Sequence, residues 1–134
     1  MLTNLFKGRR NAPPVVQTVT IRILDSLLTV VLCVNDRQTA KIQCVTEADH
    51  AILIGDIQHT NNASDFNKGY GTVMMENLIT YAKENGYTYL YGNLSRVDLS
   101  HKERLHHFYQ KFGFSITEYA EAKDFYYGKI ELNL

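Results

Sequence analysis

The chain has 134 residues, of which 45% are hydrophobic and 21% are charged, a size and balance typical of one globular domain with a buried core. The chain contains 14 Lys and Arg residues and 14 Asp and Glu residues, so its formal net charge is zero. No net charge therefore favours nucleic acid, an anionic membrane or an acidic substrate as a partner. No apolar stretch approaches the roughly 20 residues needed to cross a bilayer, and no signal-peptide core follows the basic start.

We therefore expect a single cytoplasmic domain over residues 1–134, with no nucleic-acid or membrane partner and with a flexible N-terminal segment at 1–14. Segments rich in Val, Ile, Leu and Thr then predict strands at 15–24, 27–34, 41–47 and 51–59. Asp25-Ser26 leaves room only for a tight turn, and residues 35–38 make a slightly longer one. This half of the chain predicts an antiparallel meander.

The two cysteines, Cys33 and Cys44, fall on neighbouring predicted strands. In a chain without a secretion signal, two thiols are expected to stay reduced and buried, where cysteine behaves as a small hydrophobic residue. The sequence has no CxxC pair and no clustered Cys and His at metal-ligand spacing, so we expect no metal site.

The pattern changes after the fourth strand, where 61–67 predicts a polar loop. Apolar residues at helical spacing then predict two helices, the first ending at Gly86 and the second running from about Leu99 to Gly113. The apolar positions are Met74, Met75, Leu78, Ile79 and Ala82 in the first helix and Leu105, Phe108, Tyr109 and Phe112 in the second. Strands are expected at 87–94, 114–119 and 124–133. The predicted fold class is therefore α/β (α+β), with a mixed, mostly antiparallel central sheet and helices on its faces.

The loop Asn67-Lys68-Gly69-Tyr70-Gly71-Thr72 joins the fourth strand to the first turn of the first helix. A helix start presents unpaired N–H groups and the positive end of the helix dipole, and glycines let the backbone close around a phosphate. The pattern therefore favours a diphosphate site. It is not the Rossmann motif, because Met74 stands where the third glycine belongs, nor Walker A, because Lys68 precedes the glycines. A tight turn that binds no ligand is the alternative.

A second motif follows downstream, Phe108-Tyr109-Gln110-Lys111-Phe112-Gly113-Phe114. It is similar to the pattern Phe/Leu-Tyr-x-Lys-x-Gly-Phe of the GNAT N-acetyltransferase superfamily, and the loop is similar to the GNAT pattern Gln/Arg-x-x-Gly-x-Gly/Ala. The resemblance implies a GNAT-like acyl-CoA N-acyltransferase fold and transfer of an acetyl group from acetyl-CoA to an unidentified amine. It implies cofactor contacts from Phe66, Asn67, Lys68, Gly69, Tyr70, Gly71, Thr72, Lys102 and Lys111. The strand ending near His59 would pair its backbone with the pantetheine arm.

The sequence also departs from the family pattern. Phe66 stands where the family has Gln or Arg, and Lys102 stands where many members carry Asn. Asp25-Ser26 leaves no room for the one or two helices that the family inserts between its first two strands to cover the acceptor. The alternatives are an open acceptor side, an acceptor side completed by a homodimer, or a non-catalytic acyl-CoA-binding or protein-interaction module.

By the same resemblance, Tyr109 lies near the CoA sulfur and acts as the general acid, since a phenol with an ordinary pKa of about 10 stays protonated at neutral pH. Simple packing of its ring in the core is the alternative. The general base is open. Asp56 or His59 is the first choice, and Glu47 and Asp49 also lie on or near strands that should border the cleft.

The second predicted helix carries further charged residues. Lys102, Arg104 and Lys111 are suited to the 3′-phosphate of CoA, which favours Lys or Arg. His101, His106 and His107 could suggest a metal site or an anion patch, but the adjacent His106 and His107 point to different faces of a helix, so at most one of them can join His101 on one side. A solvated helix face is therefore expected.

Overall fold

The computed structural model describes residues 15–59 and 69–134. The N-terminal segment predicted at 1–14 lies outside the described residues, as do the loop predicted at 61–67 and the predicted cofactor residues Phe66, Asn67 and Lys68. Within the two described ranges, no helix is long and apolar enough to cross a membrane.

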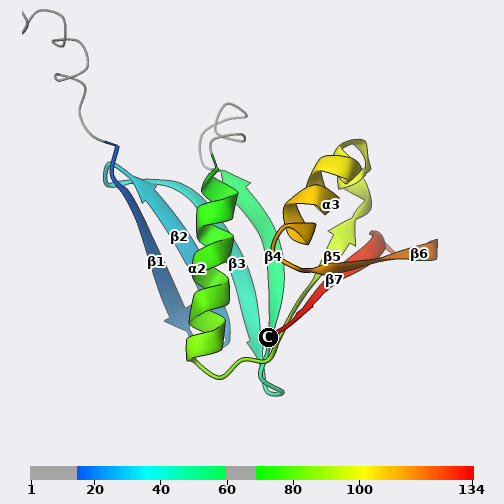
Figure 1. Cartoon of the computed structure of the whole chain (residues 1–134), viewed down its shortest axis with the longest axis horizontal. Helices are drawn as coiled ribbons and strands as arrows, with labels where there is room; N and C mark the ends of the chain where they lie inside the picture. Colours follow the sequence, from blue (N-terminus) through cyan, green and yellow to red (C-terminus); the bar gives the residue numbers. More distant parts are fainter. Residues whose placement is uncertain (1–14, 60–68) are drawn as a thin grey trace, which may run out of the picture.

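The described residues form one seven-stranded sheet in the order β1-β2-β3-β4-β5-β7-β6 (Figure 1). The strands are β1 (Gln17–Leu24), β2 (Leu27–Val34), β3 (Arg37–Glu47), β4 (Ala51–His59), β5 (Tyr89–Ser95), β6 (Ser115–Lys123) and β7 (Tyr126–Asn133). The helices are α2 (Tyr70–Glu84) and α3 (Lys102–Gln110), and a 3₁₀ segment, η2 (Arg96–His101), leads into α3. β4 and β5 pair in parallel, and the other neighbouring strands are antiparallel. The predicted mixed, mostly antiparallel sheet is therefore confirmed.

Two-residue turns join the first three strands. Asp25, Asn35 and Asp36 have φ values of 53°, 50° and 66°, a left-handed conformation that Asn and Asp tolerate because their short side chains can bond the local backbone. The prediction of a longer turn at 35–38 is wrong. β3 already begins at Arg37, because Asn35 and Asp36 supply both positive φ angles that a two-residue hairpin turn needs.

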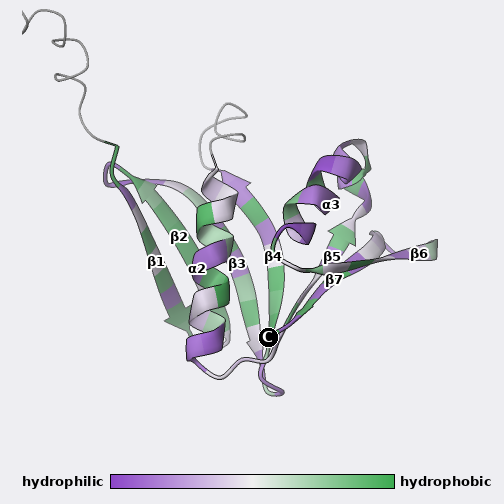
Figure 2. Ribbon diagram, in the orientation of Figure 1, coloured by the Kyte–Doolittle hydropathy of each residue, from purple (hydrophilic) through white to green (hydrophobic). Residues whose placement is uncertain are grey.

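The main core lies between α2 and the face of the sheet formed by β1, β2 and β3 (Figure 1). α2 buries Met74, Met75, Leu78 and Ala82 completely, and Figure 2 shows hydrophilic and hydrophobic residues alternating along this helix. Each fully buried Leu or Met contributes about 1.5–3 kcal/mol. The amphipathic helix predicted from this spacing is therefore present, and it anchors the glycine loop at its N-terminal end.

The cysteine thiols are both free. Cys44 is buried in the core, whereas Cys33 is only half-buried, and the strand register pairs them with Leu28 and Gln38 rather than with each other. Burial raises the pKa of the Cys44 thiol to about 12, and a hydrogen bond with the Gly55 backbone opposes part of that increase. Cys44 therefore stays protonated and behaves as a small hydrophobic residue.

A β-bulge in β4 opens the sheet. The register against β3 shifts between Ile54 and Ile57, so Gly55 and Asp56 together lie opposite Gln43. A Cβ on Gly55 would lie only 2.5 Å from the carbonyl oxygen of Gln43, so the bulge requires a glycine. The parallel pairing of β4 with β5 ends at Ile54, and beyond that point the two strands diverge, as Figure 1 shows.

Candidate active site

A cavity of about 630 Å³ opens where β4 and β5 diverge. Its walls come from the second half of β4, the start of α2, the end of β5, and the segment from η2 through α3. Its volume lies in the usual range for small-molecule sites. The predicted site residues that line it are Asp56, His59, Gly69, Gly71, Thr72, Tyr109 and Lys111. The fold therefore brings the two motifs of the sequence to a single cavity.

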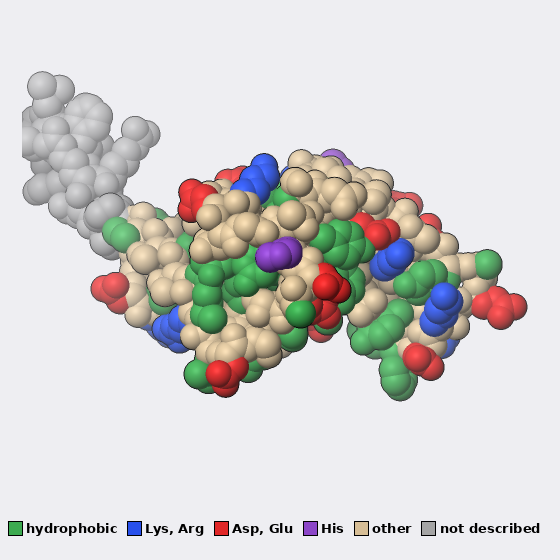
Figure 3. Space-filling view, turned by 90° about the horizontal axis from the view of Figure 1, so that it is seen from below, with side chains coloured by type: hydrophobic (Ala, Val, Ile, Leu, Met, Phe, Trp, Pro, Cys, Tyr) green, Lys and Arg blue, Asp and Glu red, His purple; other side chains and the backbone are tan. Residues whose placement is uncertain are grey.

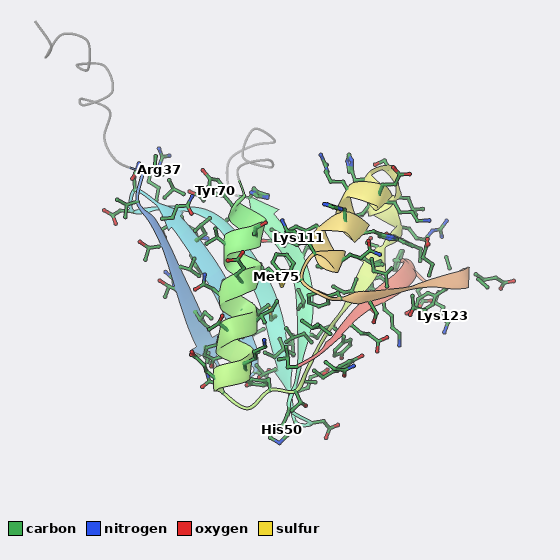
Figure 4. All side chains as sticks on the ribbon, in the orientation of Figure 1. Arg37, His50, Tyr70, Met75, Lys111 and Lys123 are labelled. Atoms are coloured by element: carbon green, nitrogen blue, oxygen red, sulfur yellow. The ribbon has the colours of Figure 1, made fainter. Side chains whose placement is uncertain are left out.

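The start of α2 forms one end of this cavity. Gly69, the N-cap residue, has a φ of 77°, no side chain caps the helix, and its first turn contains no acidic residue. The first N–H groups of α2 therefore remain available as donors, and the helix dipole adds positive potential. Lys111 comes from the end of α3 and donates from Nζ to Thr72 Oγ1 at 2.6 Å, and Figure 4 labels it between the two helices. This end is suited to a phosphate anion.

Gly71 allows α2 to approach α3 closely. A Cβ at this position would lie 3.2 Å from Cε1 of Phe108, which is a tight contact with a ring on the facing helix. The neighbouring Tyr70 is 8% exposed and belongs to the core. Of the predicted loop contacts, Tyr70 can therefore offer only its backbone to a ligand.

The edge of β4 that faces β5 is unpaired beyond the bulge. β4 pairs with β5 from Ala51 to Ile54, whereas residues 55–59 line the cavity. On the β5 side, the backbone N–H and C=O groups of this stretch have no partner among the described strands. An extended ligand that carries amide groups can pair there as an added strand would.

Tyr109 lines the cavity from α3. Its side chain is 7% exposed, and its ring packs edge-on against Phe108 and Phe114 at centroid distances of 5.2 and 5.6 Å. Its hydroxyl makes no hydrogen bond to any residue that the structure describes. Burial raises the pKa of this phenol above its ordinary value, and the charges of Asp56 and Asp98 raise it further. Tyr109 is thus both a packed core residue and a protonated donor at the cavity wall.

Asp56 lines the cavity from β4, and Asp98 lines it from η2. Partial burial raises the pKa of Asp98, the negative charge of Asp56 raises it further, and His101 opposes the increase. Both carboxylates also raise the pKa of the Tyr109 phenol, and all three groups line the same cavity. His59 lines the cavity at the end of β4, but it is not among the groups that shift the pKa of Tyr109.

Asp98 is a cavity residue that the sequence analysis did not single out as functional. Its position just beyond the end of β5 was the available signal, because ligands of sheets with parallel strands bind outside the carboxyl ends of those strands. Glu47 and Asp49 do not line the cavity. Instead, Glu47 accepts hydrogen bonds of 2.8 Å from the Tyr91 hydroxyl with each of its carboxylate oxygens.

Lys102 also lies outside the cavity. Its ammonium group pairs with the carboxylate of Glu118 on β6 and lies 6.0 Å from the centroid of the Tyr127 ring. The structure therefore turns Lys102 toward β6 and away from the start of α2, and it gives the predicted cofactor contact no geometric support.

The histidines of this segment point in different directions, as expected for neighbouring positions of a helix, and His101 and His107 are exposed. His101 and His107 line the cavity together with Arg104. His106 points elsewhere, with Nε2 at 3.0 Å from the Tyr127 hydroxyl. One side of α3 therefore faces the cavity that opens where β4 and β5 diverge.

The sequence model of the Acetyltransferase (GNAT) family matches residues 65–114, a span that includes α2, β5 and the tyrosine motif. The chain is also 30% identical over 103 residues to the uncharacterized protein YocC of Bacillus subtilis (strain 168), and the match covers 65% of this chain. It spans 59% of the length of that curated relative.

The fold is similar to those of solved acetyltransferases. A GNAT family acetyltransferase from Elizabethkingia anophelis with acetyl-CoA bound has a TM-score of 0.67 at 15% identity, covering 88% of this chain and 98% of that one. An acetyltransferase of Bacillus subtilis in complex with CoA has a TM-score of 0.62 at 15% identity, covering 90% and 99%. The GNAT family model therefore matches the segment that holds both motifs, and the chain shares the fold of solved GNAT acetyltransferases.

Proposed function

We propose that the protein is an acetyl-CoA-dependent N-acetyltransferase that moves an acetyl group directly to an amine. One observation carries the proposal: a single cavity has an uncapped helix start beside Lys111 and the buried phenol of Tyr109 in its walls. The helix start and Lys111 are suited to the phosphate groups of a thioester such as acetyl-CoA, and the phenol is suited to donate a proton to its leaving sulfur. The acetyl-CoA and CoA bound to the structural neighbours support the choice of cofactor.

The parts of CoA would lie along the cavity in order. The N–H groups at Gly69, Gly71 and Thr72 would hold the diphosphate, with Lys111 as the nearby cation. The unpaired edge of β4 over residues 55–59 would pair with the pantetheine amides. Acetyl-CoA would supply the activated acetyl group once it is bound there.

The residues near Tyr109 would handle the protons. Asp56 accepts the proton that an ammonium group must lose before its nitrogen can attack the acetyl carbon, and His59 is the alternative base. As the new N–C bond forms and the C–S bond breaks, Tyr109 gives its proton to the sulfur. It then recovers the second proton released by the nitrogen. One proton passes to solvent in the whole reaction, and no net charge stays on the protein.

A second candidate is a non-catalytic acyl-CoA-binding module, and the connection between β1 and β2 favours it. These strands are joined directly across Asp25-Ser26, so no helix covers the acceptor side at this point of the fold. An acceptor side completed by a second copy of the chain would reconcile the short connection with catalysis. Measurement of the oligomeric state with and without CoA tests that homodimer.

Thermal unfolding with CoA and acetyl-CoA tests the cofactor site. A ligand at 100 times its Kd should add about 2.7 kcal/mol to the free energy of unfolding. Gly71→Asp places a negative charge among the phosphate-facing amides and should abolish the shift. Gly71→Ala is the matched control, since it adds the same Cβ against Phe108 without the charge. A folded Gly71→Asp variant with unchanged CoA affinity would refute the phosphate site.

Release of CoA in the presence of amines separates the two candidates. The acetyltransferase predicts amine-dependent release of the free thiol, which a thiol-reactive dye detects. Binding of acetyl-CoA without such release across a broad panel of amines would favour the binding module instead.

A further inference from the structure

β1 forms one edge of the sheet, and no strand among the described residues pairs with its outer side (Figure 1). It pairs with β2 along its whole length without a register shift. The Val16 carbonyl oxygen accepts from the Asn35 N–H at 2.9 Å, so the even-numbered residues of this segment direct their backbone groups toward β2. The odd-numbered residues of β1 therefore direct their N–H and C=O groups outward.

The two edges of the sheet differ in how they are protected against pairing. β6, the opposite edge, carries Glu118, Glu121 and Lys123, and its register against β7 is irregular between Glu118 and Lys123. Charges and irregular pairing are common devices that keep an edge strand from pairing with another chain. β1 has a single charged residue, Arg22, and contains neither proline nor glycine. Its outer edge is therefore suited to the addition of another strand.

Exposed apolar side chains lie at both ends of β1. Val15 and Val16 come just before the strand, Ile23 and Leu24 end it, and all four side chains are more than half exposed. Figure 3 shows hydrophobic side chains at the surface on the left of the molecule, the side on which β1 lies in Figure 1. An antiparallel copy of the same strand would bring one apolar end against the other and cover both.

The register of such a pairing follows from the strand itself. With Thr20 opposite Thr20 of a second copy, the odd-numbered residues of the two strands exchange backbone hydrogen bonds along the whole edge. Leu24 then lies opposite Val16 of the second copy, and Arg22 faces no other charge. A shift of two residues in either direction places Val16 opposite Arg22 or Ser26 instead. The apolar ends match in one register only.

We propose that β1 pairs antiparallel with β1 of a second copy of this chain, forming a homodimer with one sheet that continues through both subunits. β2 and β3 separate β1 from β4, so the partner strand lies roughly 19 Å from β4 at the usual strand spacing. The pairing therefore adds no residue to the cavity. It differs from a dimer that completes the acceptor side, and it does not depend on the proposed acetyltransferase function.

Charge substitutions at Thr20 test both the surface and the register. Thr20 is exposed, and in the proposed register its Cβ lies about 5 Å from the same atom of the second copy. Thr20→Asp and Thr20→Lys each place like charges opposite one another and should weaken dimerisation at least about tenfold. An equimolar mixture of the two variants should restore a dimer, because opposite charges then face each other. Sedimentation velocity over a range of protein concentrations measures each variant and the mixture.

Thr117 on β6 supplies the matched control. It is also an exposed threonine on an edge strand, so Thr117→Asp and Thr117→Lys make the same changes outside the proposed interface. Both control variants should dimerise as the wild-type protein does. Thermal unfolding shows whether each variant is folded.

Amide hydrogen exchange gives a second measurement, made on the wild-type protein alone. In the dimer, the N–H groups of the odd-numbered residues of β1 should be protected, and dilution to the monomer should remove that protection. The N–H groups of the even-numbered residues should stay protected by β2 at every concentration. This alternation does not depend on whether a variant folds.

Each contrary result overturns the proposal in a different way. A wild-type protein that stays monomeric at every concentration refutes the dimer, and protected outward amides in that monomer would assign the edge to residues 1–14 of the same chain. A dimer that persists in both Thr20 variants places the interface elsewhere. Variants that dissociate but do not associate when mixed refute the antiparallel register. CoA binding is measured separately, so these results leave the proposed reaction untouched.

Discussion

Replacement of Tyr109 by phenylalanine separates proton donation from packing. The ring is 7% exposed and keeps its edge-on contacts with Phe108 and Phe114, so the variant retains the buried apolar surface. The lost hydroxyl has no hydrogen-bond partner among the described residues, and removal of such a group changes the free energy of unfolding by no more than about 1 kcal/mol. The melting temperature should therefore move by only a few degrees.

Turnover should respond far more strongly. A positioned general acid contributes about 10²- to 10⁴-fold to the rate, so kcat should fall by that factor while the Kd for acetyl-CoA stays unchanged. Because burial and then the charges of Asp56 and Asp98 raise the pKa of the phenol, Tyr109 stays protonated as the pH rises to about 10. The wild-type rate should therefore show no alkaline loss from this residue below that pH.

The assay is the release of CoA with an amine that the wild-type protein acetylates, run beside calorimetric titration of acetyl-CoA and thermal unfolding of both proteins. A Tyr109→Phe variant whose kcat stays within about threefold of wild type would refute proton donation by this phenol. Tyr109 would then have a packing role only. A large fall in both kcat and melting temperature would instead mean that the hydroxyl supports the fold, contrary to the geometry described above.

Three further substitutions test other parts of the fold and site. Gly55→Ala should lower the melting temperature by several degrees and weaken CoA binding, because the added Cβ would lie 2.5 Å from the Gln43 carbonyl oxygen. A variant with wild-type stability would show that the bulge tolerates a side chain. Lys111→Met should weaken CoA binding about tenfold, as expected for the loss of one charge-assisted contact. The control variant Lys123→Met, at the end of β6, should leave CoA binding unchanged. Equal effects of the two variants would contradict a specific phosphate contact by Lys111. For Cys44, the folded-state pKa is raised from 9.0 to about 12, so its stabilising effect is complete below about pH 9 and is lost as the pH rises toward 12. Urea unfolding of Cys44→Ala between pH 7 and pH 11 should show a shallower alkaline decline than wild type, and identical declines would contradict this cause.

The elements of the fold follow largely from local pattern. β2 and β4 span the predicted residues 27–34 and 51–59, because alternating Val, Ile and Leu bounded by polar turn residues is a local signal. The error at 35–38 came from treating Arg37 and Gln38 as turn residues on the basis of polarity. In the structure they begin β3, since Asn35 and Asp36 alone adopt the positive φ angles that the turn needs.

Each of the two motifs is a continuous run of residues in the sequence. This is why the glycine loop and Tyr109 were recognisable before the fold was known. Gly69, Gly71 and Thr72 of the loop line one cavity with Tyr109, and the roles of the two motifs as phosphate site and general acid remain proposals. Lys102 shows the limit of such reasoning. Its spacing from Tyr109 suggested a cofactor contact, but the direction of the side chain depends on Glu118, a residue on another strand.

The sequence by itself determined both helices and most of the strands, because each depends on neighbouring residues and on periods of two or about 3.6 residues. The shape of the cavity depends instead on contacts between distant residues. The bulge forms because Gly55 lies against the carbonyl of Gln43 on the adjacent strand. The divergence of β4 and β5 then places Asp56, Asp98 and Tyr109 in the walls of one cavity. No local pattern encodes that arrangement, since it arises from strand register and packing, and the shape of the cavity is therefore a property of the folded chain.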